Sequence, residues 1–87
     1  MNIHYSEEFR KHFYKLPKNA QRAYRTQEER FRKNWKDARL HVKKLSGRNI
    51  VFSFRVTRNY RVLFMIVEDN TIIFSAIGNR KDIYRKS

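Results

Sequence analysis

Two arginines lie in the most apolar stretch of the chain, residues 50 to 66. Arg55 stands before the turn-forming residues 57 to 59, and Arg61 stands after them. A strand that buries most of its side chains has little reason to carry a guanidinium, whose forked donors bind phosphate oxygens in pairs. Taken alone, each arginine is more often an ordinary solvated residue on an open sheet face. Two of them beside one turn, in a chain this basic, favour an anion site.

The same stretch has the period-two pattern of β-strands. Apolar residues alternate with others from Ile50 to Val56, and again from Tyr60 to Ile66. The turn residues between these runs predict an antiparallel pair. The later half of the second run is apolar on both faces, which indicates an inner position. After turn chemistry at residues 68 to 70, Thr71 to Ile77 predicts another strand, and the strands together form a meander.

The N-terminal part predicts a short strand followed by a helix. Asn2 to Tyr5 has the strand pattern, and Ser6 is a good N-cap for the helix that follows. Phe9, Phe13 and Leu16 then fall on one helical face, which indicates a stripe that packs on the core.

Pro17 interrupts this helix and begins a second one, which runs to about Trp35. The face expected to pack on the core carries Ala20, Ala23, Tyr24, Gln27, Phe31 and Trp35. The two helices are expected to form a hairpin. The predicted fold class is α+β: a short N-terminal strand, a helical hairpin, and then an antiparallel β-meander with the helices packed on one face, all in a single domain of residues 1 to 87.

Asp37 to Arg48 connects the second helix to the sheet. The residues expected to anchor this connector are Leu40, Val42 and Leu45. Ser46 and Gly47 have turn composition. Lys43, Lys44 and Arg48 lie close to the strand that follows, where they either extend a phosphate-binding surface or are ordinary exposed charges.

Gly78 follows the last strand and is one of only two glycines. We expect it to serve backbone geometry, because glycine adopts conformations that other residues avoid. The chain then turns away and brings Arg80, Lys81 and Asp82 to the end of the sheet, with Tyr84 beside them.

The charge of the chain indicates a polyanionic or acidic partner. Its 21 lysines and arginines against 8 acidic residues give a formal net charge of +13. Such an imbalance opposes compaction and favours association with nucleic acid. An anionic membrane fits less well, because membrane anchors gather their charge on one amphipathic helix, whereas these cations are spread along the chain. An acidic protein that neutralises the surface is compatible with either role.

The rest of the composition excludes several classes of protein. The chain has no cysteine, which excludes a disulfide scaffold and a thiolate zinc site. Its three histidines, His4, His12 and His41, lack ligand spacing, so neither a metal nor another cofactor is expected. With no signal peptide and no apolar run near 18 residues, a soluble cytoplasmic protein is the expectation.

Three motifs, LSGR, SFRVTRNYRVLF and IGNRKDIY, resemble the RelE/ParE superfamily of toxins from type II toxin-antitoxin modules. The order of the predicted elements is also similar over nearly the whole chain. The resemblance implies a sheet with helices on one face and an open, concave working face. It also implies that a co-expressed antitoxin wraps the toxin in a hetero-oligomer. RelE-like members cut messenger RNA in the ribosome, whereas ParE-like members inhibit DNA gyrase.

The resemblance further implies that Arg61, Arg80 and Tyr84 match positions that RelE-like nucleases use, and that Arg55 matches a recurrent arginine. The sequence departs from the pattern in two respects. Asn79 stands where many relatives have a histidine before the arginine. The strand before the turn also lacks the lysines that some RelE-like enzymes carry. The general base therefore has no matched residue.

RNA cleavage without metal requires an aligned 2′-hydroxyl, stabilised phosphate charge and proton transfer. Our hypothesis is that Arg61 and Arg80 clamp the scissile phosphate, Arg55 supports them, and Tyr84 stacks on a base or assists proton transfer. The cations expected to bind the rest of the RNA are Lys43, Lys44, Arg48, Arg58 and Lys81. Among the histidines, only His41 near Lys43 merits a test for proton transfer.

Other interpretations stay open. Arg80 can instead cap the sheet or pair with Asp82, and Tyr84 can be a packed aromatic. For the whole chain, the alternatives are a gyrase inhibitor without nuclease activity and a plain nucleic-acid-binding module whose cations only hold phosphates.

Overall fold

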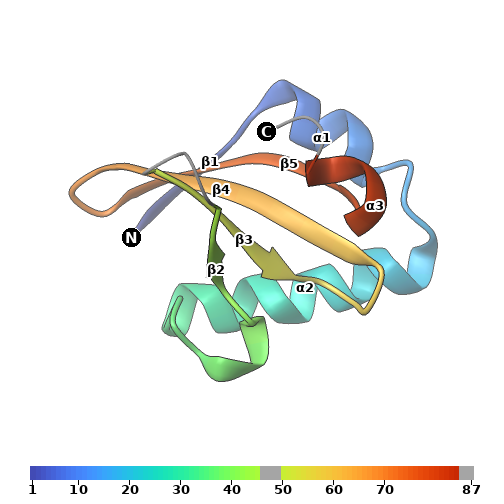
Figure 1. The fold of residues 1–87 in the computed structure, drawn as a ribbon, viewed down its shortest axis with the longest axis horizontal. Coiled ribbons are helices and arrows are strands. Elements are labelled where there is room, and N and C mark those ends of the chain that lie inside the picture. The colour runs from blue at the N-terminus through green and yellow to red at the C-terminus, as the bar shows by residue number, and fades with distance from the viewer. Residues whose placement is uncertain (46–49, 85–87) are drawn as a thin grey trace.

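The protein is described by a computed structural model that covers residues 1 to 45 and 50 to 84. Within them the chain forms a five-stranded sheet with two helices packed on one face, which confirms the predicted α+β class (Figure 1). The elements are β1 (Asn2–Tyr5), α1 (Glu7–Phe13), α2 (Lys18–Lys33), the 3₁₀ helix η1 (Ala38–Leu40), β2 (Lys43–Lys44), β3 (Val51–Arg55), β4 (Tyr60–Glu68), β5 (Thr71–Asn79) and α3 (Arg80–Ile83). No helix of the described residues has the length and apolar character needed to cross a membrane.

The sheet has the strand order β1-β5-β4-β3-β2. β3, β4 and β5 form the predicted antiparallel meander, with β4 in the inner position that its apolar faces indicated. β1 lies parallel to β5 at one edge, with Ile3 beside Ile72. At the other edge β2 pairs with β3, so the segment read as a plain connector contains a strand. A run of two lysines is too short and too polar to show the alternation of apolar and polar residues that predicts a strand.

The core lies between the sheet and the two helices. Phe54, Phe64 and Phe74, from three neighbouring strands, surround Phe31 of α2 at ring-centroid distances of 5.3, 5.0 and 5.1 Å. All four side chains have 0% exposure. Each buried phenylalanine contributes roughly 1.5 to 3 kcal/mol of transfer free energy. This aromatic cluster holds the sheet against α2.

Both helices begin near the predicted residues but end earlier than expected. The Ser6 hydroxyl oxygen accepts the Phe9 N–H at 3.0 Å, which confirms the predicted N-cap of α1. α1 ends at Phe13, so Leu16 packs on the core from the link between the helices. α2 ends at Lys33 because Asn34 adopts an extended backbone, and Trp35 packs from beyond the helix.

The two helices contact each other through aromatic rings. Tyr24 of α2 lies 5.6 Å from Phe9 and 5.2 Å from Phe13, both of α1. Phe9 also lies 5.8 Å from Phe74 of β5. The helical pair therefore covers one face of the sheet as a packed unit.

The end of the sheet differs from the prediction. β5 continues to Asn79 and is followed directly by α3, a helical turn too short to give a periodic signal. Gly78 is not required for this turn, because its backbone is not left-handed and an added Cβ would meet no atom within 4 Å. Instead the Asn79 side chain accepts the Lys81 N–H at 2.8 Å and caps α3. The predicted turn at Ser46 and Gly47 lies outside the described residues.

Candidate active site

A pocket of about 310 Å³ opens on the sheet face opposite α1 and α2. Its lining comes from the end of η1, from β2, β3 and β4, and from α3 and the residue after it. The lining residues are His41, Lys43, Ser53, Arg55, Arg61, Arg80, Lys81 and Tyr84. The three arginines singled out from the sequence therefore meet in one pocket, together with the tyrosine.

Strand register explains why the arginines share a face. Arg55 of β3 lies directly opposite Arg61 of β4, and Arg61 lies opposite Gly78 of β5. Cross-strand partners project to the same face, and so do residues two apart such as Ser53 and Arg55. Like charges directly opposite each other destabilise a sheet. An anion between them would offset that repulsion.

Arg61 is held in position by the β3–β4 turn. Its Nη1 atom donates to the carbonyl oxygens of Thr57 at 2.7 Å, Arg58 at 3.0 Å and Tyr60 at 3.1 Å. Burial lowers the pKa of Arg61; the nearby Tyr84 opposes this shift, and the charge of Arg55 adds to it. Because the turn fixes the guanidinium, no ordering of this side chain is needed when a ligand arrives.

Arg55 carries an unsatisfied donor. Its Nε atom is buried and has no hydrogen-bond acceptor among the described residues. A buried unpartnered donor costs about 1 to 3 kcal/mol.

α3 brings the last two cations and the tyrosine to the pocket. The Arg80 N–H donates to the Asn59 carbonyl at 2.8 Å, which ties the start of α3 to the β3–β4 turn. Ile83 is buried against Leu63 and Ala76 on the open face and anchors the other end of the helix. No ion pair of the described residues joins Arg80 to Asp82, so that alternative is not observed.

Tyr84 lies at the rim, with 38% of the residue exposed. Its hydroxyl donates to the Ser53 Oγ atom at 3.5 Å, and Tyr84 also interacts with Arg61 in the same pocket. Tyr84 is therefore neither a fully packed aromatic nor a remote one.

Two further residues of the pocket, Ser53 and His41, are not among those that the resemblance matched to the site. No role was predicted for Ser53 from the sequence. Its signal is a small polar residue on the same face of β3 as Arg55. His41 has a left-handed backbone with φ of 50°, uncommon outside glycine, and its imidazole lines the pocket.

The structure separates the predicted RNA-binding residues into two groups. Lys43 and Lys81 line the pocket. Lys44 and Arg58 do not line it, and their predicted contact with RNA stays a prediction. Lys44 lies opposite Phe52, whose side chain belongs to the covered face, because neighbouring strand residues alternate. Arg58 is exposed in the turn and contributes only its carbonyl to Arg61. Arg48 lies outside the described residues.

In the described part of the chain, no three His, Asp or Glu side chains gather as they would around a metal ion. The chemistry of the pocket is that of cations, hydroxyls and one imidazole. Such groups can bind phosphate oxygens and move protons.

Solved toxin structures have the same fold. The chain is similar to the RelB–RelE antitoxin–toxin complex from Methanococcus jannaschii, at 25% identity and a TM-score of 0.77 over 93% of this chain and 94% of that one. It is similar to the archaeal RelE–RelB complex from Pyrococcus horikoshii, at 19% identity and a TM-score of 0.76 over 93% and 96% of the chains. YafQ from E. coli matches at 17% identity and a TM-score of 0.74 over 95% and 97%. The fold is that of RelE-like toxins.

The sequence model of the family described as ParE toxin of type II toxin-antitoxin system, parDE, matches residues 3 to 84. The chain therefore belongs to this family, within the RelE/ParE superfamily of type II toxins. No curated protein matches it in sequence.

Proposed function

We propose that this toxin is a ribosome-dependent, metal-independent endoribonuclease that cuts messenger RNA and so inhibits translation. The observation that supports it most is the convergence of Arg55, Arg61 and Arg80 with Tyr84 on one pocket of the open sheet face. Guanidinium forks suit the non-bridging oxygens of a phosphate. A site that stabilises developing phosphate charge with fixed donors is a common basis of catalysis.

The proposed cleavage is attack of a ribose 2′-oxygen on the neighbouring phosphorus. This forms a 2′,3′-cyclic phosphate and breaks the bond from phosphorus to the 5′-oxygen. One proton leaves the 2′-hydroxyl, and one is delivered to the departing 5′-oxygen. Arg61 and Arg80 bind the non-bridging oxygens, and Arg55 beside them in the pocket supports them. Tyr84 stacks on a base or assists a proton transfer.

His41 is the imidazole in this pocket. Histidine is the side chain suited to accept and release protons near neutral pH. We assign it the role of exchanging a proton with the 2′-hydroxyl. This role had no matched residue, because Asn79 stands where many relatives have a histidine. The lysines Lys43 and Lys81 hold flanking phosphates.

The proposed partners are the ribosome with its mRNA and a cognate antitoxin, in the cytoplasm. The similar structures from Methanococcus jannaschii and Pyrococcus horikoshii are toxin–antitoxin complexes. The net charge of +13 is compatible with RNA and with an acidic antitoxin. A hetero-oligomer with the antitoxin is the expected resting form.

The test is substitution within the pocket and just outside it. Arg61→Ala and Arg80→Ala should each abolish growth inhibition and transcript cleavage by the expressed toxin. Arg58→Ala removes the same charge from the same turn, outside the pocket, and should leave both near the wild-type level. If Arg61→Ala and Arg80→Ala were as toxic as the wild type, the assignment would be wrong.

A second candidate is inhibition of DNA gyrase without nuclease activity. The match to the ParE family model supports it, because ParE-like toxins are the gyrase inhibitors of the superfamily. The two functions differ in what fails first after induction. Loss of mRNA integrity and protein synthesis supports the nuclease, whereas early DNA-damage signalling with intact transcripts supports gyrase inhibition.

A further inference from the structure

Gln27 of α2 is a buried polar side chain to which the proposed chemistry gives no role. It is 5% exposed and lies on the face of α2 that packs on the core. A buried amide requires hydrogen-bond partners, because burial without them is costly. The partners of Gln27 therefore indicate what this amide contributes to the fold.

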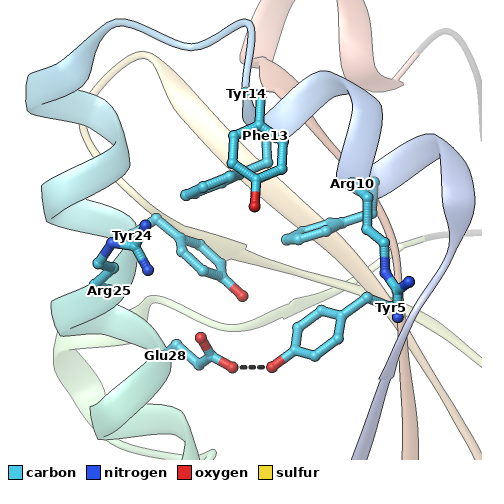
Figure 2. A pocket seen from close by; sticks show the side chains of 8 residues that line it. Tyr5, Arg10, Phe13, Tyr14, Tyr24, Arg25 and Glu28 are labelled. Carbon is cyan, nitrogen blue, oxygen red and sulfur yellow. Dashed lines mark hydrogen bonds between the residues drawn. The ribbon is translucent and has the colours of Figure 1, made fainter.

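Neighbouring polar residues of α2 contact different parts of the protein. Glu28 lies in a pocket lined by residues of α1 and α2, where it accepts a hydrogen bond from the Tyr5 hydroxyl (Figure 2). Arg32 Nη2 donates to the same carboxylate at 3.2 Å. These contacts join α2 to β1. Gln27, one residue earlier, contacts the elements that carry the pocket lined by Arg55 and Arg61, called here the arginine pocket.

The Gln27 amide joins η1 to the end of β3. Its Nε2 atom donates to the Arg39 carbonyl of η1 at 3.1 Å and to the Arg55 carbonyl of β3 at 2.7 Å. Its Oε1 atom accepts a hydrogen bond from Arg30 Nη1 at 2.8 Å. Two carbonyls that need a donor and a guanidinium that needs an acceptor fit only one orientation of the amide. The two carbonyl contacts together are called the Gln27 bridge below.

The Arg55 carbonyl faces the edge of β3 along which β2 pairs. Across this edge the Leu45 N–H donates to the Val51 carbonyl at 3.0 Å. Carbonyls of alternate strand residues point to the same side. Arg55, four residues after Val51, therefore directs its carbonyl toward the same edge, where a paired strand would normally supply the donor.

β2 does not extend far enough to supply that donor. It begins at Lys43, which lies opposite Ser53. The same antiparallel register would place His41 opposite Arg55. His41 has a left-handed backbone with φ of 50°, which is not a strand conformation. The ladder therefore stops before Arg55, and Gln27 donates to the Arg55 carbonyl in place of a strand.

Both carbonyls of the Gln27 bridge lie close in the chain to side chains of the arginine pocket. Arg55 itself lines the pocket, and Arg39 stands two residues before His41, which also lines it. Arg61 is held differently, because its guanidinium donates to three carbonyl oxygens of the β3–β4 turn and its neighbour Tyr60. The placement of His41 relative to Arg55 therefore depends on Gln27, whereas the placement of Arg61 does not.

We propose that Gln27 is a positioning residue of the active site, whose amide fixes His41 and Arg55 relative to each other. The inference rests on the proposed nuclease function, in which His41 exchanges a proton with the 2′-hydroxyl and Arg55 supports the phosphate clamp. Gln27 itself does not touch the RNA. Because it removes motion between groups that must act together, it increases the rate of the chemical step rather than the affinity for RNA.

The experiment compares cleavage of messenger RNA on purified ribosomes by the wild type and by two variants of Gln27. Gln27→Met has a similar length and removes both donors. Gln27→Glu keeps the shape and the acceptor for Arg30, but in neither protonation state can it donate to both carbonyls. Each variant should lower kcat roughly 10- to 100-fold and leave KM within about twofold of the wild type.

Gln21→Met is the matched control. Gln21 is also a buried glutamine of α2, with 8% exposure, and its Nε2 atom donates to the Leu16 carbonyl at 3.0 Å, in the link between α1 and α2. Neither Gln21 nor Leu16 lines the arginine pocket. The control variant should also have a lower thermal midpoint than the wild type, but its kcat should match the wild type when all the proteins are assayed below their midpoints.

NMR spectra of the free proteins test the Gln27 bridge without RNA. In Gln27→Met, the resonances of the His41 imidazole and of the Arg55 Nε–H should shift. The Nε–H resonance of Arg61 should keep its position, because its acceptors lie in the β3–β4 turn and at Tyr60. Gln21→Met should leave all three signals unchanged.

Wild-type kcat values for both Gln27 variants would overturn the positioning role and leave the proposed nuclease intact. An equal fall in kcat for Gln21→Met would also overturn it, because the loss would then come from weakened folding. A wild-type toxin that cut no RNA would overturn the nuclease and with it the catalytic role of Gln27. Unchanged His41 and Arg55 resonances in Gln27→Met would overturn the bridge in either case.

Discussion

The two faces of the sheet use the same strand geometry for opposite purposes. On the covered face, Phe54, Phe64 and Phe74 lie on adjacent strands and are fully buried around Phe31. On the open face of β3 and β4, Arg55 and Arg61 lie directly opposite each other beside a pocket. One alternation of side chains thus supplies stability on one face and a concentration of positive charge on the other.

The two faces differ in whether their side chains have suitable interaction partners within the chain. Every large ring of the covered cluster has apolar neighbours, and its burial stabilises the fold. The open face keeps like charges opposed and leaves Arg55 Nε without an acceptor. Local features that destabilise a free protein gather at functional sites, because the ligand supplies the missing interactions.

The largest expected effect is on the covered face. Phe31→Ala removes the ring that contacts all three strand phenylalanines and should lower the free energy of unfolding by about 3 to 5 kcal/mol. In a domain of this size that is a large share of the total stability. Urea unfolding measures it. Arg61→Met on the open face should stay folded under the same conditions, and equal losses in both variants would contradict the division of roles.

A smaller effect of opposite sign is expected for Arg55→Met. The change removes a buried unpartnered donor and a charge opposite Arg61, so unfolding should require about 1 to 2 kcal/mol more. The same variant should bind a non-cleavable RNA more weakly. A protein that lost both stability and affinity would show that Arg55 supports the fold rather than the site.

The smallest effect compares two neighbouring lysines on opposite faces. Lys43→Ala should reduce the dependence of log affinity on log salt for single-stranded RNA by about 0.7, because one phosphate contact is lost. Lys44→Ala should leave the slope unchanged, although it removes the same charge one residue away. Fluorescence anisotropy over a salt series measures both. Equal slopes for the two variants would indicate that only the overall charge matters.

Strong periodicity and cap chemistry made much of the fold predictable. The alternation in residues 50 to 77 predicted the meander, and Ser6 predicted the start of α1. β2 and α3 were missed because elements of two and four residues are too short to show a period. Gly78 was misread because glycine is only permissive of unusual backbone, and here the cap of Asn79 makes the turn.

The placement of site residues could be predicted only where strand register fixes the sheet face to which a side chain projects. Arg55 and Arg61 share a face by register, so their meeting followed from the strand pattern. Lys44 and Arg58 were expected to bind RNA because of their charge, and charge alone could not tell that they lie outside the pocket. Ser53 was missed because a single serine in an apolar strand has many explanations, and His41 depended on a left-handed residue after η1 that no motif encodes.

The most direct test of the central proposal is an NMR titration of the toxin with a 2′-deoxy dinucleotide, which lacks the attacking hydroxyl. The titration follows the arginine side chains. We expect the Nε–H resonances of Arg55, Arg61 and Arg80 to shift together with a single dissociation constant, while that of Arg58 stays unchanged. Shifts at clearly different ligand concentrations, or a shift of Arg58 without the other three, would contradict a common phosphate site.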